Sequence, residues 1–238
     1  MRVLPALAFL IGLLPASGAE LLVGAASDLG TLSDKLGMPA SKPLGMRVRF
    51  TLASSGDLAQ QIANGAPFDV FLSANESYVT DSVKKGYLDG STVQVYARGK
   101  LALWSKSGSV RSLDDLRKPG VLHVAIPDPQ HAPYGIAARA ALEKSGLWKS
   151  IESKIVYGEN VRQALQFAET GNADAVITSW TLLQHRGVLL SEDLYPPIRQ
   201  AGAVLKSSAQ PGAARMFLKF LSSPEGQKIL AEGGLFPP

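Results

Sequence analysis

The stretch Phe50-Thr-Leu-Ala-Ser-Ser-Gly-Asp-Leu-Ala-Gln-Gln-Ile62 changes from the hydrophobic period of a strand to that of a helix within a few residues. Apolar residues occupy every second position up to Leu52 and then recur four apart as far as Ile62. Ser54 and Ser55 lie at the change, where free backbone N–H groups and the positive end of a helix dipole can hold an anion. For Ser55 alone, an ordinary helix cap is the competing interpretation.

The same junction recurs along the chain. An apolar strand from Leu21 reaches Ser27 and is followed by leucines at helical spacing. In the second half, one strand leads into the Pro-rich loop Pro127-Asp-Pro-Gln-His-Ala-Pro-Tyr-Gly135, and another leads into Asn160-Val161. In open α/β sheets, ligands bind at the carboxyl ends of strands, so these turns are expected to converge on one crevice.

Strands alternating with helices predict an α/β fold with mostly parallel sheets and helices on their faces. A long extended stretch, 92–104, continues past Gly99 and is the expected crossing between two lobes. We place lobe I at residues 20–97 and 203–238 and lobe II at residues 98–202. The first helix is expected to be short, because Gly37, Pro39 and Pro43 interrupt it.

The first residues, the net charge and the lack of cysteine indicate the compartment and exclude several kinds of partner and site. Residues 1–19 have the basic start, the apolar run and the small final residues of a cleavable secretory signal, with cleavage near Ala19. The formal net charge is +4 without a dense Lys/Arg run, which argues against a nucleic-acid partner. The chain has no cysteine, so disulfides, thiolate metal sites and a cysteine nucleophile are excluded.

Few residues suit an enzyme. His123, His131 and His185 are far apart in sequence and show no metal-binding or acid-paired spacing, so we interpret them as surface or core residues. There is no Gly-x-Ser-x-Gly elbow and no Walker loop. Asp128 could form an acid pair with His131, but stabilising the Pro-rich loop is the favoured role. Asp28 and Asp57 are favourably placed in the first turn of a helix, and neither needs a catalytic role.

Taken in order, several segments resemble the periplasmic molybdate-binding proteins of molybdate ABC transporters, a family of the two-lobed bacterial solute-binding class. The resemblance covers nearly all of the chain after the signal. The segments that carry it are Ala25-Ala-Ser-Asp-Leu29, Ala53-Ser-Ser-Gly-Asp-Leu-Ala-Gln-Gln-Ile62, Gly65-Ala-Pro-Phe-Asp-Val-Phe-Leu-Ser-Ala74, Asp128-Pro-Gln-His-Ala-Pro-Tyr-Gly135, Gly158-Glu-Asn-Val-Arg-Gln-Ala-Leu165 and Gly171-Asn-Ala-Asp-Ala175.

The resemblance implies the two-lobed type II periplasmic-binding-protein fold with a ligand cleft between the lobes. It also implies that an oxyanion is held by the hydroxyls and backbone N–H groups of Ser27 and Ser55 and by the backbone N–H groups of Tyr134 and Val161. Many members carry a tyrosine hydroxyl where this chain has Ser179. The hydroxyl of Tyr134 is an alternative aromatic donor from across the cleft, and Asp28 and Ser179 are additional candidate ligands.

The expected function is capture of molybdate or tungstate in the periplasm and delivery to the membrane permease subunits of an ABC transporter. The resemblance implies a monomer without a cofactor, and oxyanion binding that is insensitive to pH near neutrality because no donor titrates. Two alternatives stay open. One is a binding protein for sulfate, phosphate or ferric iron, the last using Tyr134 with Asp28 and Asp57. The other is a periplasmic enzyme on the same scaffold.

Overall fold

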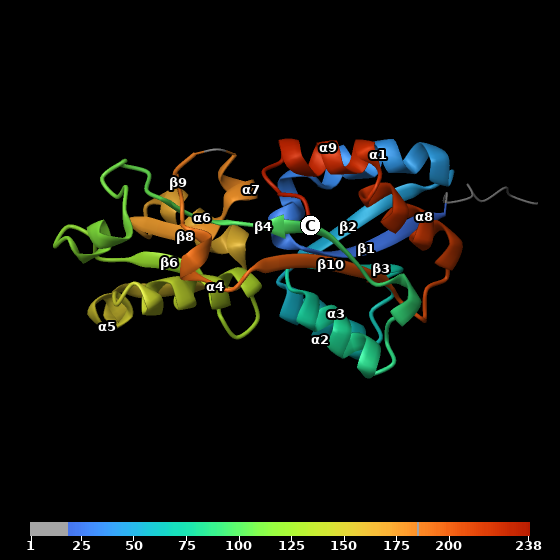
Figure 1. Cartoon of the computed structure of the whole chain (residues 1–238), viewed down its shortest axis with the longest axis horizontal. Coiled ribbons are helices and arrows are strands. Elements are labelled where there is room, and N and C mark those ends of the chain that lie inside the picture. The colour runs from blue at the N-terminus through green and yellow to red at the C-terminus, as the bar shows by residue number, and fades with distance from the viewer. Residues whose placement is uncertain (1–18, 185) are drawn as a thin grey trace, which may run out of the picture.

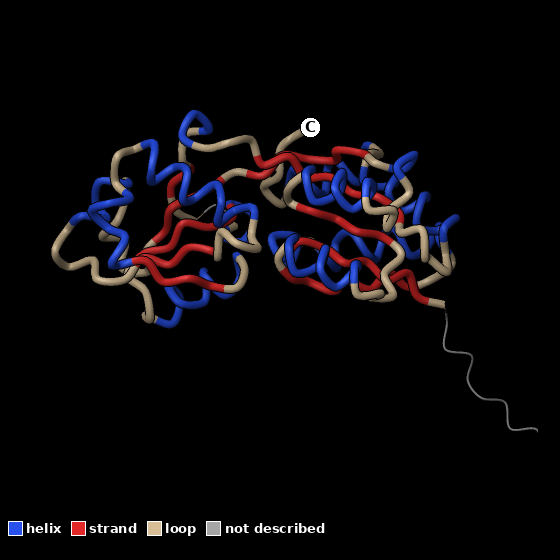
Figure 2. Tube along the Cα trace, turned by 90° about the horizontal axis from the view of Figure 1, so that it is seen from below, coloured by secondary structure: helices blue, strands red, loops and turns tan. Residues whose placement is uncertain are grey.

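Two five-stranded sheets, each with its own helices, form two lobes joined by two crossing segments (Figures 1 and 2). The computed structural model describes residues 19–184 and 186–238. Except for Ala19, the predicted signal segment lies outside these residues, as does His185. The predicted two-lobed α/β fold is confirmed.

The sheet of lobe I has the order β2-β1-β3-β10-β4. Strand β1 pairs in parallel with β2 and β3, whereas β10 pairs antiparallel with β3 and β4. The strands are β1 (Glu20–Ala26), β2 (Arg47–Ala53), β3 (Val70–Ser73), β4 (Gln94–Gly99) and β10 (Ile198–Val204). The helices are α1 (Ser33–Leu44), α2 (Ser55–Ala63), α3 (Glu76–Lys84), α8 (Pro211–Leu221) and α9 (Pro224–Glu232).

The sheet of lobe II has the order β7-β6-β8-β5-β9, again with parallel and antiparallel pairs. Its strands are β5 (Leu101–Trp104), β6 (Val124–Pro127), β7 (Ile155–Gly158), β8 (Ala175–Ser179) and β9 (Val188–Leu189). Its helices are α4 (Pro133–Lys144), α5 (Trp148–Ile151), α6 (Val161–Thr170) and α7 (Trp180–Leu183).

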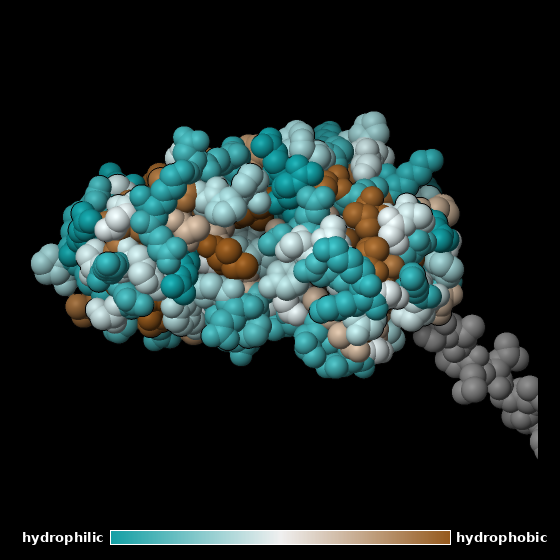
Figure 3. Space-filling model, turned by 60° about the horizontal axis from the view of Figure 1, so that its bottom comes forward, coloured by the Kyte–Doolittle hydropathy of each residue, from teal (hydrophilic) through white to brown (hydrophobic). Residues whose placement is uncertain are grey.

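Helices cover both faces of each sheet. In lobe I, α1, α8 and α9 lie on one face and α2 and α3 on the other (Figure 1). Two separate apolar clusters result, one containing Leu36 and Phe217 and the other Leu58 and Phe71. In lobe II, α4 and α6 lie on opposite faces (Figure 1). The outer surface is largely hydrophilic on the side shown in Figure 3.

The chain passes from lobe I to lobe II at Lys100, between β4 and β5, and returns through residues 191–197 before β10. We call these two segments the hinge. An ion pair between Lys100 and Glu192 ties one to the other. The predicted boundaries at 97/98 and 202/203 fall inside β4 and β10, which both belong to the first sheet.

The expectation of a short first helix is wrong, because α1 continues through both prolines to Leu44. Each proline lacks one N–H donor, but burial of the apolar face of α1 against β2 outweighs this loss. Ser41 stabilises the same turn: its hydroxyl donates to the Gly37 carbonyl (2.7 Å) and accepts from Val48 N–H (3.2 Å).

Within residues 19–184 and 186–238, no helix has the length and apolar character required to cross a membrane.

Candidate functional site

Four strand-to-helix turns, two from each lobe, meet at one small cavity at the junction of the lobes. It brings together all four predicted site residues, Ser27, Ser55, Tyr134 and Val161, with Asp28 beside them. The other lining residues are Ala26, Ala53, Ser54, Ala74, Ala132 and Pro133. The cavity volume is about 10 Å³, room for about one water molecule. A larger occupant therefore requires the lobes to separate slightly.

Ser55 is not the cap of α2, which overturns the ordinary-cap interpretation. The cap is Ser54, whose hydroxyl accepts from Asp57 N–H (3.2 Å) and donates to Asp57 Oδ2 (2.6 Å). Ser55 is fully buried, and its Oγ accepts from Ala74 N–H at 3.0 Å. This bond fixes the oxygen and leaves the hydroxyl proton to be donated into the cavity.

Ser27 opens the 3-10 helix Ser27–Thr31 directly after β1. It is buried and lines the cavity, and no side-chain hydrogen bond of Ser27 occurs within the part of the chain that the structure describes. Its hydroxyl is therefore available as a donor to whatever enters the cavity.

The backbone N–H groups at the starts of α2, α4 and α6 are the other donors. The first residues of a helix have no carbonyl four residues back within the helix. Among the described residues, the N–H groups of Ser55, Tyr134 and Val161 have no hydrogen-bond acceptor. In α6, Asn160 Oδ1 accepts from the N–H groups of Arg162 and Gln163 and leaves that of Val161 free. Gly135 lets the Pro-rich loop close on α4, since a Cβ there would lie 2.2 Å from the Pro127 carbonyl.

Asp28 also lines the cavity and is only 1% exposed. Its Oδ2 accepts from the Tyr134 hydroxyl (2.9 Å) and from Gln200 Nε2. Its Oδ1 has no hydrogen-bond partner among the described residues. Burial raises the pKa of this carboxyl to about 6, although the hydrogen bonds from Tyr134 and Gln200 act in the opposite direction.

The two predicted hydroxyl donors of lobe II are bonded to other groups of the protein. The Tyr134 hydroxyl donates a hydrogen bond to Asp28, and the pKa of Tyr134 is raised well above the usual value by burial and by the neighbouring carboxylate. Ser179 is buried outside the cavity lining and caps α7: it accepts from Thr181 N–H (3.2 Å) and shares a hydrogen bond with the Thr181 hydroxyl. Tyr134 can therefore contribute its N–H, and Ser179 has a structural role.

The Pro-rich loop also contacts lobe I. The Gly56 N–H donates to the His131 carbonyl across the cleft at 2.9 Å. His131 Nδ1 lies 3.8 Å from Asp57 Oδ1, with both side chains about half exposed. Asp128 accepts from Gln130 N–H and stabilises the loop, as predicted. His123 is exposed, as expected of a surface residue.

The comparison with protein families agrees with this geometry. Residues 21–236 match the family model described as bacterial extracellular solute-binding protein. The chain belongs to this family.

The relatives of this chain include molybdate-binding proteins. The molybdate-binding protein ModA of Rhodobacter capsulatus is 36% identical over 237 residues, covering 96% of this chain and 93% of the relative. The solved periplasmic molybdate-binding protein of Azotobacter vinelandii superposes with a TM-score of 0.87 at 29% identity, covering 92% of this chain and 99% of the other. The sulfate-binding protein SubI of Mycobacterium tuberculosis, at 19% identity and a TM-score of 0.71 over 92% of this chain and 86% of that chain, shares the fold alone.

Several residues around the family's interlobe cleft were not predicted from sequence. Gln200, in β10, reaches Asp28 and accepts a hydrogen bond from the Tyr96 hydroxyl (2.8 Å). Arg162, in the first turn of α6, extends across the cleft to Gly30, where a Cβ would meet its Nη1 at 2.7 Å. Arg162 is exposed and forms no ion pair with any described residue. The sequence contains one signal for this residue: a basic side chain stands in the first turn of a helix, where the helix dipole disfavours a positive charge.

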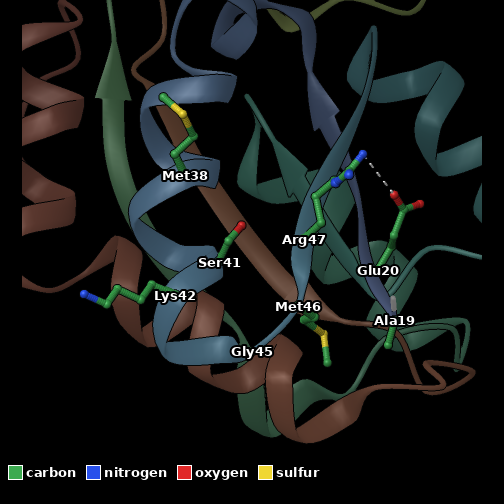
Figure 4. A pocket seen from close by; sticks show the side chains of 8 residues that line it. All are labelled: Ala19, Glu20, Met38, Ser41, Lys42, Gly45, Met46 and Arg47. Carbon is green, nitrogen blue, oxygen red and sulfur yellow. Dashed lines mark ion pairs between the residues drawn. The ribbon is translucent and has the colours of Figure 1, made fainter. Parts of the chain in front are cut away.

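A wider hollow of about 790 Å³ lies far from the cleft, between α1 and the first residues of β1 and β2 (Figure 4). Glu20 and Arg47 point toward one another there and form an ion pair at 3.9 Å. All of its lining residues belong to lobe I, so a solute there could not bridge the two lobes as one in the interlobe cavity can.

Proposed function

We propose that this protein captures molybdate or tungstate between its lobes and delivers the anion to the membrane permease subunits of an ABC transporter. The observation that carries the proposal is the convergence of Ser27, Ser55, Tyr134 and Val161 from both lobes on one cavity. The molybdate-binding relatives that match almost the whole chain support this choice of ligand.

The chemistry of the donors suits a tetrahedral dianion. Two hydroxyls and the free N–H groups of three helix N-termini surround the cavity, and none of its lining residues carries a positive charge. Helix N-termini bind anions through aligned N–H groups and the helix dipole. Each hydrogen bond to a charged ligand contributes about 1.5 to 3 kcal/mol, so these five can supply the roughly 8 kcal/mol of a micromolar site and offset part of the cost of closure.

We further propose that the protein acts in the periplasm after removal of the signal, as a monomer, and needs no cofactor and catalyses no reaction. The basic start, apolar run and small final residues of residues 1–19 support export. Delivery to a permease follows from closure, because an anion that bridges both lobes favours a closed form that the transporter can distinguish from the open one.

The ferric-iron alternative has less support. Among the described residues, no three His, Cys, Asp or Glu side chains are grouped so that they could hold a metal ion. Tyr134 and Asp28 are bonded to each other, and Asp57 is bonded to Ser54 at the rim. Sulfate has the same shape and charge as molybdate, so neutral donors separate these two anions by their size.

A thermal-shift panel of molybdate, tungstate, sulfate, phosphate and ferric citrate tests the proposal. A ligand at 100 times its Kd stabilises the folded state by about 2.7 kcal/mol, so the true ligand gives a clear rise in Tm. We expect molybdate and tungstate to give the largest shifts. A larger shift with sulfate, phosphate or ferric citrate would overturn the ligand, and turnover of a small substrate would revive the enzyme alternative.

A further inference from the structure

The ring of Tyr134 reaches from lobe II into the hinge. At Gly99, the last residue of β4 before the crossing, a Cβ would lie 2.0 Å from the Tyr134 hydroxyl oxygen and 2.9 Å from Cζ. On β10, the lobe I strand that follows the return crossing, Gln200 Nε2 lies 3.3 Å from the same oxygen. The tip of a lobe II side chain therefore lies against the two lobe I strands that lead into and out of the hinge.

Asp28 holds this tip from lobe I. Its Oδ2 accepts from both the Tyr134 hydroxyl and Gln200, and its backbone carbonyl accepts from the Thr181 hydroxyl of lobe II at 2.7 Å. Asp28 follows Ser27 directly, and Tyr134 carries one of the free N–H groups at the cavity. One buried network thus connects two of the four anion-binding turns to the hinge.

We propose that Asp28 is the positioning residue that couples anion capture to lobe closure, an inference that rests on the proposed function. By anchoring the Tyr134 hydroxyl in the hinge, it brings the N–H at the start of α4 to the anion only when the lobes close. Opening must break the bonds from Tyr134 and Thr181 to Asp28, because donor and acceptor lie on different lobes. The remaining bond, from Gln200, stays within lobe I.

No cation among the described residues forms an ion pair with Asp28 or stabilises its negative charge. The polar groups in contact with it are the neutral side chains of Tyr134, Gln200 and Thr181, and Tyr96 approaches through Gln200. Its negative charge would repel a dianion in the cavity. The raised pKa of Asp28 is consistent with a carboxyl that takes up a proton as the lobes close.

The test is a steric double-mutant cycle at the hinge. Gly99→Ala places a methyl group where the Tyr134 hydroxyl docks, and Tyr134→Phe removes that hydroxyl while keeping the backbone N–H. We expect Gly99→Ala to weaken molybdate binding roughly tenfold or more, as overpacking of a closed interface does. Adding Tyr134→Phe should recover much of this loss. Gly120→Ala is the matched control, since nothing lies within 4 Å of a Cβ there.

Closure is measured in the same proteins, with and without molybdate, as the distance between spin labels on the two lobes. Because the chain has no cysteine, Lys149→Cys and Lys228→Cys give unique labels on exposed residues of α5 and α9. Gly99→Ala should shift the distance toward the open form, and the double variant should shift it back. Asp28→Ala should also open the protein, whereas Asp28→Asn, which can still accept from Tyr134, should largely restore closure.

The outcomes separate the two proposals. If Gly99→Ala binds and closes like Gly120→Ala, or if the losses of Gly99→Ala and Tyr134→Phe simply add, the coupling role of Asp28 is wrong even though wild type binds molybdate. If wild type binds no molybdate, the proposed function fails, while the distances without anion still decide whether the hinge network controls closure.

Discussion

The hydroxyl of Tyr134, on lobe II, donates a hydrogen bond of 2.9 Å to Oδ2 of Asp28, on lobe I. Both residues are buried at the lobe junction, and both line the anion cavity. This bond makes closure sensitive to the protonation of one carboxyl, although none of the direct donors titrates. From the sequence, we expected anion binding to be insensitive to pH near neutrality. The titration of Asp28 adds a pH dependence on the acid side of neutrality.

The first prediction concerns pH and stability. The pKa of Asp28 is raised by burial from 3.8 to about 6 in the folded protein. Its stabilising contribution is therefore fully present below about pH 3.8 and is lost as pH rises through 6. Asp28→Asn replaces the carboxyl by an amide that does not titrate, so no buried charge forms at high pH. The free energy of unfolding of this variant should exceed that of wild type by on the order of 3 kcal/mol above pH 7. Unfolding by urea at a series of pH values measures the difference, and a difference that does not change with pH would contradict it.

The second prediction concerns selectivity. Molybdate and sulfate carry the same charge, so neutral donors separate them only by size, and the smaller anion leaves some N–H groups unpaired. Each unpaired buried donor costs about 1 to 3 kcal/mol, so two give discrimination of roughly thirtyfold or more. Competition titration of sulfate against molybdate measures the ratio. Equal affinities would show that the cavity is not sized for molybdate.

The third prediction concerns Arg162, which lies at the cleft beside Gly30 and has no ion-pair partner in the part of the chain that the structure describes. An exposed cation raises the association rate of an anion, and salt screens the effect. Arg162→Gln should slow association severalfold at low salt and leave dissociation nearly unchanged. Arg139→Gln removes the same charge from a residue paired with Glu143 and serves as the control. Stopped-flow traces in which both variants behave alike would remove Arg162 from the entry path.

The fourth prediction concerns Ser179, whose hydroxyl is bonded to Thr181 and stands outside the cavity lining. Ser179→Ala should weaken molybdate binding less than Ser55→Ala, while losing about 1 kcal/mol of stability with the cap of α7. Calorimetry on both variants compares them. A greater loss of affinity in Ser179→Ala would place its hydroxyl at the anion.

Sequence predicted the parts of the site that depend on local pattern. Ser27 and Ser55 are visible because a strand period changes to a helix period beside them, and this change forms the turns that meet at the cavity. The role of Gln200 could not be predicted from local sequence. It depends on the pairing of β10 with β3 and β4, two strands that lie far from β10 in the sequence. The length of α1 was missed for a related reason: packing against β2 overrides the local effect of its prolines.

The same limit applies to the direction of side chains. The Pro-rich loop predicts that Tyr134 lies at the cleft, but it does not predict whether the hydroxyl points to the anion or to the hinge. Gly99 determines the direction of the hydroxyl, because the missing side chain leaves space for the end of the Tyr134 ring. Nothing in the sequence around Gly99 indicates a contact with a residue in α4.

The account depends most directly on Ser27 and Ser55 as donors to molybdate, and calorimetric titration of their alanine variants tests it. We expect Ser27→Ala and Ser55→Ala each to lose about 1.5 to 3 kcal/mol of binding free energy with the fold intact. Ser223→Ala, which removes the cap of α9 away from the cleft, should lose stability and keep its affinity. Unchanged molybdate affinity in both Ser27→Ala and Ser55→Ala would contradict the assignment of the site.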